Sequence, residues 1–450
     1  MASAPVVAVS TLLDQRGISS FHIRLIFWSA LIALFDGYDI AAISLAAPHL
    51  VREWGVDRSA LGPVLSASLV GILFGSMIFG WIGDRYGRKT ALIGSLLLFG
   101  IFTWVAAHAT NLTQMTWLRL VAGLGIGGVI PNMIAINIES APRRLRGTLG
   151  LIATGLVPVG GALPGFVSAL WVPQYGWPIL FYIGGIAPVV IAILALFWMP
   201  ESIKYMTIHE RQRSKLVRLI QQLSPGYVVP EGARFVVEDE KQFPSSHPKY
   251  LFRDGLAVIT PLLWLLFALN LMGYFFLLSW TPTLLTAAKL PPATAALSIA
   301  LLQIGGTVGS LVLIRWLDRY QFAAITILFL VAVPVVGSLG MIGVGSTKTV
   351  LLAACFVAGF CVLGIQSGIN VAGALVYPTS LRANGSGWQL GIGRLGSIIG
   401  PLLGALFVSL PVQQLYMWSA LPFVLGAVVC FSIYRLNEAR LRGRNEPRAA

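Results

Sequence analysis

Residues 25–50 read LIFWSALIALFDGYDIAAISLAAPHL, an apolar run that carries two carboxylates, Asp36 and Asp39. The run is long enough to cross a bilayer as a helix, and a charge at its middle costs about 2.5 to 3.5 kcal/mol on insertion scales. Because residues three positions apart share one helix face, the two acids lie on the same side. We expect that side to face protein or water, never lipid.

The composition is that of a membrane protein. Of the 450 residues, 56% are hydrophobic and 11% are charged, whereas soluble chains carry roughly a quarter charged residues. The first two dozen residues lack the features of a signal peptide, so we expect the first helix to remain as an uncleaved anchor. The sequence predicts an all-α integral membrane protein with twelve transmembrane helices, near residues 25–50, 60–83, 90–108, 113–138, 148–171, 177–199, 257–285, 294–317, 322–344, 349–377, 384–410 and 413–434.

The second half of the chain repeats the first. A shift of 236 residues aligns Gly37 with Gly273, and a shift of 234 aligns Gly71 with Gly305. Six spans per half give both halves the same topology, and substrate sites in such carriers lie between the halves near the midplane. We expect an N-terminal six-helix bundle at residues 1–199, a cytoplasmic loop at 200–256, a C-terminal six-helix bundle at 257–435 and a cytoplasmic tail at 436–450.

The net charge of +14 follows from membrane topology. Of the 31 Lys and Arg residues, four lie in loops expected outside and two lie within spans, which leaves 25 for the termini and the other loops. This asymmetry predicts an inner-membrane protein with both termini in the cytoplasm, and it removes the reason to expect a nucleic-acid partner.

The segment between the halves contains a basic stretch, Lys204 to Leu223. It forms either an amphipathic helix on the membrane surface, with Leu216, Ile220 and Leu223 on its apolar side, or a solvated linker helix.

The loop after the second predicted helix reads GWIGDRYGRK at residues 80–89 and resembles the major facilitator superfamily, as does the chain over nearly its whole length. The resemblance implies that Asp84 and Arg88 latch the cytoplasmic side of the carrier. A second motif, ESAPRRLRG at 139–147, resembles a pattern of sugar-porter-like members. The alternative is a set of static ion pairs that only fix topology. The gating candidates are Asp84, Arg88, Glu139, Arg146, Asp318 and Arg382.

Four charges lie deep in predicted spans: Asp36, Asp39, Arg119 and Arg394. Counting along the helices places the two acids and Arg394 near mid-depth and Arg119 nearer the outer third. The planar fork of arginine binds a carboxylate through two hydrogen bonds, so Arg394 is the first choice for holding an anion. A buried acid can bind a proton outside and release it inside, and we place Asp39 slightly ahead of Asp36. The competing hypothesis is a set of static ion pairs between helices.

Three segments are similar to the aromatic acid:proton symporter family: DGYD at 36–39, RLVAGLGIGG at 119–128, and YPTSLRANGSGW at 377–388 leading to GIGR at 391–394. The resemblance implies that Asp36 and Asp39 are needed for proton-coupled transport, and that Arg119 and Arg394 serve binding or coupling. The implied substrate is a benzoate-like or hydroxybenzoate-like carboxylate.

Other polar and aromatic side chains in the spans are candidates for the substrate site. Asn270 with Tyr274, and Gln366 with Asn370, are spaced to share a helix face and to bind ring hydroxyls; hydrogen bonding between helices is an equal alternative. Aromatic side chains can stack on a ring, or instead pack in the core or lie in the membrane-interface belt; they are Tyr38, Phe275, Phe276 and Trp388. The full set of substrate-binding candidates is Arg394, Arg119, Tyr38, Asn270, Tyr274, Gln366, Asn370 and Trp388.

Taken together, these features predict a monomeric secondary transporter rather than an enzyme. It imports an aromatic carboxylate with protons by alternating access, with no metal and no cofactor besides the coupling proton. The Glu139 motif and Pro200-Glu201-Ser202 keep a sugar or aliphatic organic-acid carrier open as an alternative. A membrane sensor that does not transport is a further one.

Overall fold

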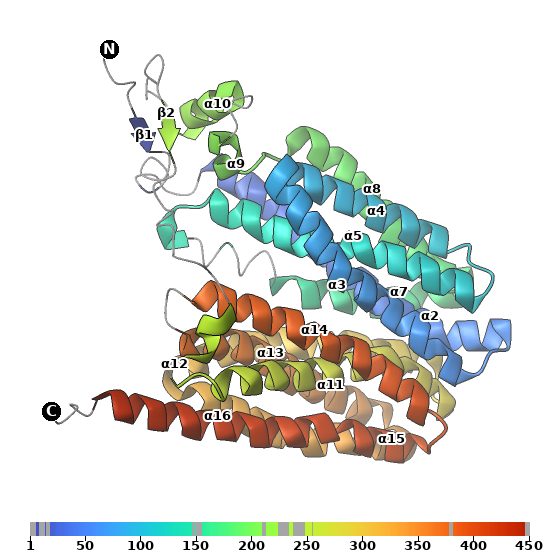
Figure 1. Cartoon of the computed structure of the whole chain (residues 1–450). Helices are drawn as coiled ribbons and strands as arrows, with labels where there is room; N and C mark the ends of the chain where they lie inside the picture. Colours follow the sequence, from blue (N-terminus) through green and yellow to red (C-terminus); the bar gives the residue numbers. More distant parts are fainter. Residues whose placement is uncertain are drawn as a thin grey trace, which may run out of the picture.

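The computed structural model describes residues 6–8, 14, 19–145, 149, 155–208, 213–223, 234–236, 248–253, 255–377 and 381–445. Long helices run side by side in two groups (Figure 1). The first group holds α2 (Ser20–Trp54), α3 (Leu61–Tyr86), α4 (Arg88–Ala106), α5 (Leu112–Glu139), α7 (Val157–Tyr175) and α8 (Pro178–Trp198). The second holds α11 (Ile259–Ala287), α12 (Pro292–Gly345), α13 (Lys348–Val376), α14 (Arg382–Phe407), α15 (Val412–Ser419) and α16 (Leu421–Asn445).

Among the described residues, eleven helical segments are long and apolar enough to cross a membrane. Two of them, Pro292–Leu313 and Gln321–Gly345, belong to α12, which breaks at Gln321 where φ is 37°. The predicted span at 148–171 corresponds to α7, which is not among the eleven; it packs against α2 and α12 in the bundle. The fold class is therefore confirmed as a helical membrane protein.

The sequence did not predict the two short strands β1 (Val6–Ala8) and β2 (Arg234–Val236), which pair in parallel beside the first group of helices (Figure 1). They mark one end of the bundle, called here the strand end. The interdomain helices α9 (Ile203–Ile208) and α10 (Arg213–Leu223) lie at the same end.

The apolar side of α10 is covered by protein. Leu216 and Ile220 are buried, and α10 packs on α9. Because these two residues of the apolar side are already covered by protein, the structure favours the linker-helix interpretation of this segment.

The sequence repeat reappears as matched close contacts between helices. A Cβ on Gly71 would lie 2.2 Å from the Leu120 carbonyl oxygen, and one on Gly305 would lie 2.0 Å from that of Phe356. Gly71 corresponds to Gly305 by the shift of 234 residues, and Leu120 corresponds to Phe356 by the shift of 236. The same glycine-to-carbonyl contact therefore occurs in both halves. Small residues let helix backbones approach this closely in a membrane.

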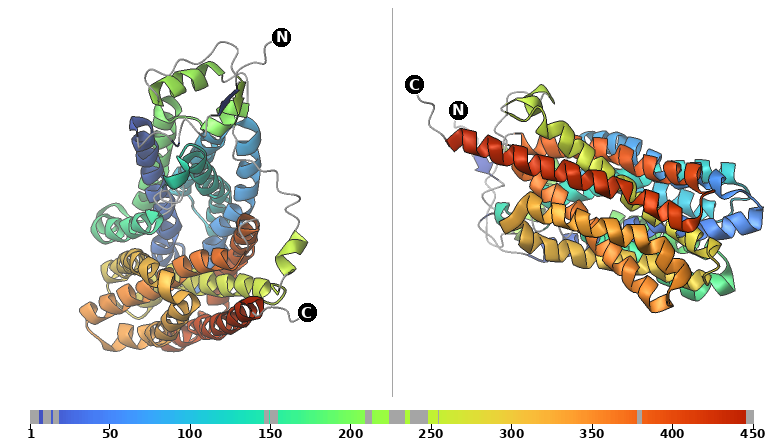
Figure 2. Two further views of the ribbon diagram at one scale, coloured as in Figure 1. Left: turned by 90° about the vertical axis from the view of Figure 1, so that its left-hand side faces the viewer. Right: turned by 90° about the horizontal axis from the view of Figure 1, so that it is seen from below.

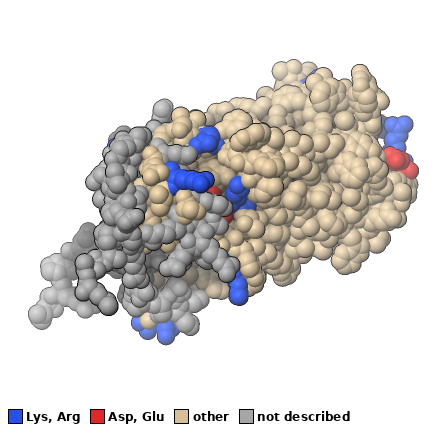
Figure 3. Space-filling view, turned by 90° about the horizontal axis from the view of Figure 1, so that it is seen from above, with Lys and Arg blue, Asp and Glu red and all other residues tan. Residues whose placement is uncertain are grey.

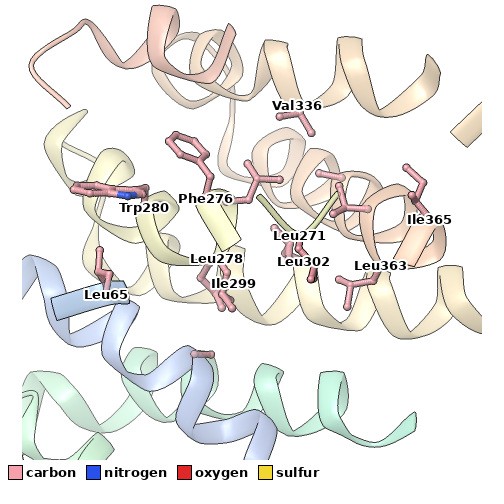
Figure 4. Packing of buried hydrophobic residues seen from close by; sticks show 14 of the residues in the cluster. Leu65, Leu271, Phe276, Leu278, Trp280, Ile299, Leu302, Val336, Leu363 and Ile365 are labelled. Atoms are coloured by element: carbon pink, nitrogen blue, oxygen red, sulfur yellow. The ribbon is translucent and has the colours of Figure 1, made fainter. Parts of the chain in front are cut away.

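The two groups share a core at the end opposite the strands. One continuous buried cluster joins α2 from Tyr38 to Leu50 with second-half residues such as Leu278 and Trp280. Figure 4 shows part of this cluster, with Leu65 of α3 beside Trp280 of α11. A separate cluster around Leu25 and Trp28 contains buried residues of the first half alone. The halves therefore share a buried core toward the far end, whereas the fully buried residues of the Leu25–Trp28 cluster belong to the first half. The two groups of helices can be followed in Figure 2.

The surface supports a membrane location. Figure 3 shows an uncharged flank between Lys and Arg side chains near the strand end and a smaller charged group at the opposite end. Apolar side chains such as Phe74, Met77 and Leu196 are exposed on this helical bundle, as lipid contact requires.

Candidate functional site

A cavity of about 200 Å³ lies between the two halves. Its walls come from α2, α3 and α5 on one side and from α11, α13 and α14 on the other, and most of them are aliphatic or aromatic. The lining residues are Asp36, Ile40, Leu69, Ile72, Ile126, Ile130, Phe267, Leu271, Phe275, Gln366, Leu390, Arg394 and Ser397. Such a chamber, apolar with a few polar groups, is typical of a small-molecule site.

Two opposite charges line this cavity, one from each half. Asp36 of α2 is 3% exposed, and its Oδ1 has no hydrogen-bond partner within the described residues. Arg394 of α14 lines the same chamber. A buried carboxylate oxygen without a partner is costly in its ionised form, so this acid is held in the cavity by the fold rather than by a local ion pair.

The second acid of the opening stretch is enclosed within the first half. Asp39 and Arg119 are both 0% exposed and form a two-pronged ion pair, with Oδ2 to Nη2 at 2.5 Å and Oδ1 to Nη1 at 2.9 Å. Neither residue lines the cavity. Arg119 thus reaches from the N-terminal part of α5 to α2, where Asp39 lies one helical turn beyond Asp36.

Two hydroxyls complete this ion pair. Thr103 Oγ1 donates to Asp39 Oδ1 at 2.9 Å, and Arg119 Nε donates to Ser68 Oγ at 2.9 Å. The guanidinium also lies 5.8 Å from the centre of the Phe181 ring. Five helices of the first half meet at this cluster, namely α2, α3, α4, α5 and α8. Sequence reasoning missed Ser68 and Thr103, whose only signal was a hydroxyl within an apolar run.

Of the polar candidates in the second half, one reaches the cavity. Gln366 lines it, and its Oε1 accepts a hydrogen bond from Asn270 Nδ2 at 2.7 Å. Tyr274 donates to Gln303 Oε1 at 3.0 Å instead of facing the chamber. Asn370 is exposed and does not line the cavity.

Of the aromatic candidates, Phe275 lines the cavity, whereas Tyr38, Phe276 and Trp388 do not. Tyr38 is buried in the core, with its ring against Gly184. Trp388 is 42% exposed and stacks on Trp264, with ring centroids 5.9 Å apart. Phe275 forms the aromatic wall together with Phe267, which sequence reasoning did not name.

An ionic cluster occupies the strand end of the first half. Arg88 contacts Asp84 at 2.5 Å and Glu139 at 3.3 Å, and the Ser202 hydroxyl donates to Glu139. Asp84 is 68% exposed, and the cluster includes no residue of the second half among those the structure describes. Arg382 begins α14, whereas Arg146 and the side chain of Asp318 lie outside the described residues.

Glu201 adds a carboxylate to this cluster, at the N-terminus of α4. Its Oε1 accepts the backbone N–H groups of Lys89 at 3.0 Å and of Ser202 at 2.8 Å. Burial raises the pKa of Glu201 above its ordinary value, and these hydrogen bonds oppose the shift. A carboxylate here satisfies helix donors that have no partner inside the helix.

A second cavity, of about 310 Å³, lies between α11, α14, α15 and α16. Its lining includes Met272, Phe276 and Trp418 and contains no charged residue. The chamber that holds Asp36 and Arg394 is therefore the candidate site.

A family model described as Major Facilitator Superfamily matches residues 29–398 of this sequence. The chain belongs to the major facilitator superfamily. This membership confirms the predicted transporter class, as opposed to an enzyme.

Among superfamily members, this chain is similar to proteins named as transporters of aromatic acids. The 4-hydroxybenzoate transporter PcaK of Pseudomonas putida is 37% identical over 89% of this chain and 90% of its own length. The gallate transporter of Pseudomonas putida is 33% identical over 98% of both chains, and the benzoate transport protein of Acinetobacter baylyi is 32% identical over 97% of this chain and 94% of its own. The resemblance to the aromatic acid:proton symporter family is confirmed.

Solved superfamily structures share the fold. A bacterial homolog of the human lysosomal transporter Spinster, in an inward-facing conformation, matches with a TM-score of 0.72 at 14% identity and covers 94% of this chain and 99% of its own. The xylose transporter XylE from E. coli matches with a TM-score of 0.69 at 18% identity, over 92% and 98% of the two chains. At these identities the likeness concerns the fold alone.

Proposed function

We propose that this superfamily member imports an aromatic carboxylate together with protons by alternating access. The observation that carries the proposal is one cavity that brings Asp36 of the first half and Arg394 of the second into a chamber with aliphatic and aromatic walls. The relatives named for 4-hydroxybenzoate, gallate and benzoate support this substrate class.

Arg394 binds the carboxylate. A guanidinium keeps its charge at any relevant pH and offers two parallel donors that match the two oxygens of a carboxylate. Phe267, Phe275 and the aliphatic walls cover the ring. Aromatic rings pack edge to face or offset against such walls and gain from burial.

Asp36, rather than Asp39, carries the proton. Asp39 is neutralised by Arg119 inside the first half, so its charge is compensated in every state that keeps this pair. Asp36 forms no ion pair with any residue of its own half that the structure describes, and its Oδ1 accepts no hydrogen bond from those residues. This reverses the order of the two acids expected from sequence.

The coupling is electrostatic. An ionised Asp36 attracts Arg394 across the cavity and competes with an anionic substrate for it, whereas a protonated Asp36 leaves Arg394 to the substrate. Proton and carboxylate therefore bind together. When the carrier is empty and Asp36 is ionised, the attraction between Asp36 and Arg394 holds the two halves together. The two charges belong to opposite halves, so their attraction acts across the interface that moves.

The remaining assignments complete the proposal. The strand end faces the cytoplasm, the protein resides in the inner membrane and it works as a monomer. When the cytoplasmic side closes, the halves are latched by Asp84, Arg88 and Glu139. In the present structure Asp84 is exposed, and the buried residues of the Leu25–Trp28 cluster at this end belong to the first half alone. Both observations agree with a latch that is open. No cofactor besides the proton takes part.

The deciding experiment is uptake into proteoliposomes with and without an imposed pH gradient. Asp36→Asn mimics the protonated acid, so we expect exchange of labelled for unlabelled substrate to persist while gradient-driven accumulation is lost. Asp57→Asn, in an exposed loop, serves as the control and should behave as wild type. Full accumulation by Asp36→Asn, or gradient-independent accumulation by the wild type, contradicts the proton role. Uptake of glucose but of no benzoate contradicts the substrate class.

A further inference from the structure

Gln366 is the polar group that α13 contributes to the cavity, and its amide is held in one orientation. Its Oε1 accepts from Asn270 Nδ2 at 2.7 Å. Asn270, on α11, is wholly buried, and its Nδ2 also donates to the backbone oxygen of Val362 at 3.3 Å.

The backbone carbonyl sets this orientation. A carbonyl oxygen only accepts, so the Asn270 amide must turn its Nδ2 toward Val362. The same Nδ2 lies against Gln366, which must then present its Oε1 to Asn270. A flip of the Asn270 amide would bring acceptors together, and a flip of the Gln366 amide would bring two donors together. The Oε1 of Gln366 is therefore occupied, and its Nε2 makes no hydrogen bond to any part of the chain that the structure describes.

We propose that Gln366 is a specificity residue that donates from Nε2 to a ring oxygen of the substrate, and that Asn270 is its positioning residue. The cavity then prefers an aromatic carboxylate with a ring hydroxyl over the unsubstituted acid. This inference rests on the proposed function, in which Arg394 holds the carboxylate.

The orientation also predicts what the site rejects. A ring hydroxyl can accept a hydrogen bond, whereas a ring amino group is mainly a donor and meets the N–H groups of Gln366. A site built to bond a polar group discriminates against analogues that lack it, because its own group is left unpaired. One neutral hydrogen bond corresponds to roughly tenfold in affinity.

Equilibrium binding to the purified full-length protein, at fixed pH and without a gradient, tests this. The ligands are benzoate and the ortho, meta and para isomers of hydroxybenzoate and aminobenzoate. For the wild type we expect at least one hydroxybenzoate to bind about tenfold more tightly than both benzoate and the matching aminobenzoate.

Two variants separate the roles. Gln366→Met keeps the length of the side chain but removes the donor, so the ratio of hydroxybenzoate affinity to benzoate affinity should fall about tenfold while benzoate still binds. Asn270→Leu frees the Gln366 amide to turn either way, so discrimination between hydroxyl and amino substituents should fall while Gln366 still bonds the hydroxyl. If Asn270 had only a structural role, Asn270→Leu would lower the affinity for all ligands equally.

The outcomes distinguish the two proposals. If the wild type binds no benzoate-type carboxylate, the proposed function itself is overturned. If it binds them all but Gln366→Met retains the hydroxyl preference, or no hydroxybenzoate is preferred, only the specificity assignment is overturned. If Gln366→Met binds no ligand at all, Asn270→Leu decides. Reduced discrimination between hydroxyl and amino substituents in that variant supports the amide orientation, and unchanged discrimination overturns it.

Discussion

At the residue scale, two acids three positions apart on one helix have different surroundings. Asp36 lies on the cavity with an oxygen that has no partner within the described residues, whereas both oxygens of Asp39 are bonded by Arg119. The two acids lie one helical turn apart on α2, and the difference arises because Arg119 of α5 bonds Asp39. A shared face of one helix therefore does not imply a shared function.

Arg394→Lys tests the geometry of the anion site. Lysine keeps the charge but loses the planar fork, so one of two charge-assisted hydrogen bonds is lost. We expect the affinity for a benzoate-type carboxylate to fall roughly 10-fold to 100-fold in equilibrium binding. Arg435→Lys, an exposed arginine of α16, is the control. Wild-type affinity in Arg394→Lys would remove Arg394 from the anion site.

The Asp39–Arg119 pair makes a prediction about stability. Arg119→Met leaves the buried Asp39 carboxylate unpaired, so we expect destabilisation of about 3 to 5 kcal/mol by thermal unfolding in detergent. The double variant Asp39→Leu/Arg119→Met removes both charges and should regain most of that loss, because apolar packing replaces the pair. A double variant as unstable as the single one would show that the pair does more than compensate charge.

At the scale of elements, glycines set how closely helices pack. A Cβ on Gly160 of α7 would lie 1.9 Å from the Leu34 carbonyl oxygen of α2, and one on Gly37 would lie 1.8 Å from that of Val157. The corresponding glycine of the second half, Gly396, meets the Ala268 oxygen at 2.0 Å. The α2–α7 crossing involves Leu34 and Gly37, which flank Asp36 along α2. This crossing thus depends on glycines, which have no side chain.

Gly160→Ala should therefore push α2 and α7 apart and destabilise the protein by about 1 to 3 kcal/mol, as overpacking does. Gly155→Ala is the matched control, since a Cβ there meets nothing within 4 Å. Its stability should change by no more than about 0.5 kcal/mol. Thermal unfolding of both variants, followed by uptake, provides the measurement. Equal behaviour of the two would contradict the close α2–α7 crossing.

At the scale of the whole molecule, the contacts between halves lie toward the end opposite the strands. A Cβ on Gly62 of α3 would lie 2.5 Å from that of Ala405 on α14, and Ser66 donates to the Ile398 carbonyl at 3.2 Å. The strand end keeps its ionic cluster within the first half. This is the arrangement of a carrier closed at one end and parted at the other.

Gly62→Phe should disfavour this closed end. The ring cannot fit between α3 and α14, so the population shifts toward the state in which the two helices separate there. We expect a longer distance between spin labels on the ends of α3 and α14, together with uptake reduced at least about tenfold. Gly345→Phe, at an open position after the last turns of α12, is the control. An unchanged label distance in Gly62→Phe would refute the assignment of this contact as the closed gate.

The fold could be predicted because its signals are local or periodic. Apolar runs predict spanning helices wherever lipid surrounds them, and the glycine offsets of the repeat reappear as the same helix contacts, Gly75 on Leu124 and Gly309 on Phe360. The exceptions are equally physical: β1 with β2 pairs segments more than two hundred residues apart, and α10 buries its apolar side on protein.

The sequence by itself determined the spans, the two halves and the four charges that lipid cannot accept, because burial of charge in a membrane always requires a reason. It did not determine which charges meet. Asp39 and Arg119 are 80 residues apart, and Asp36 and Arg394 belong to opposite halves. Only the tertiary structure paired the first two and left the others facing one cavity, since the packing of distant helices, rather than depth along any one of them, decides which side chains come within reach.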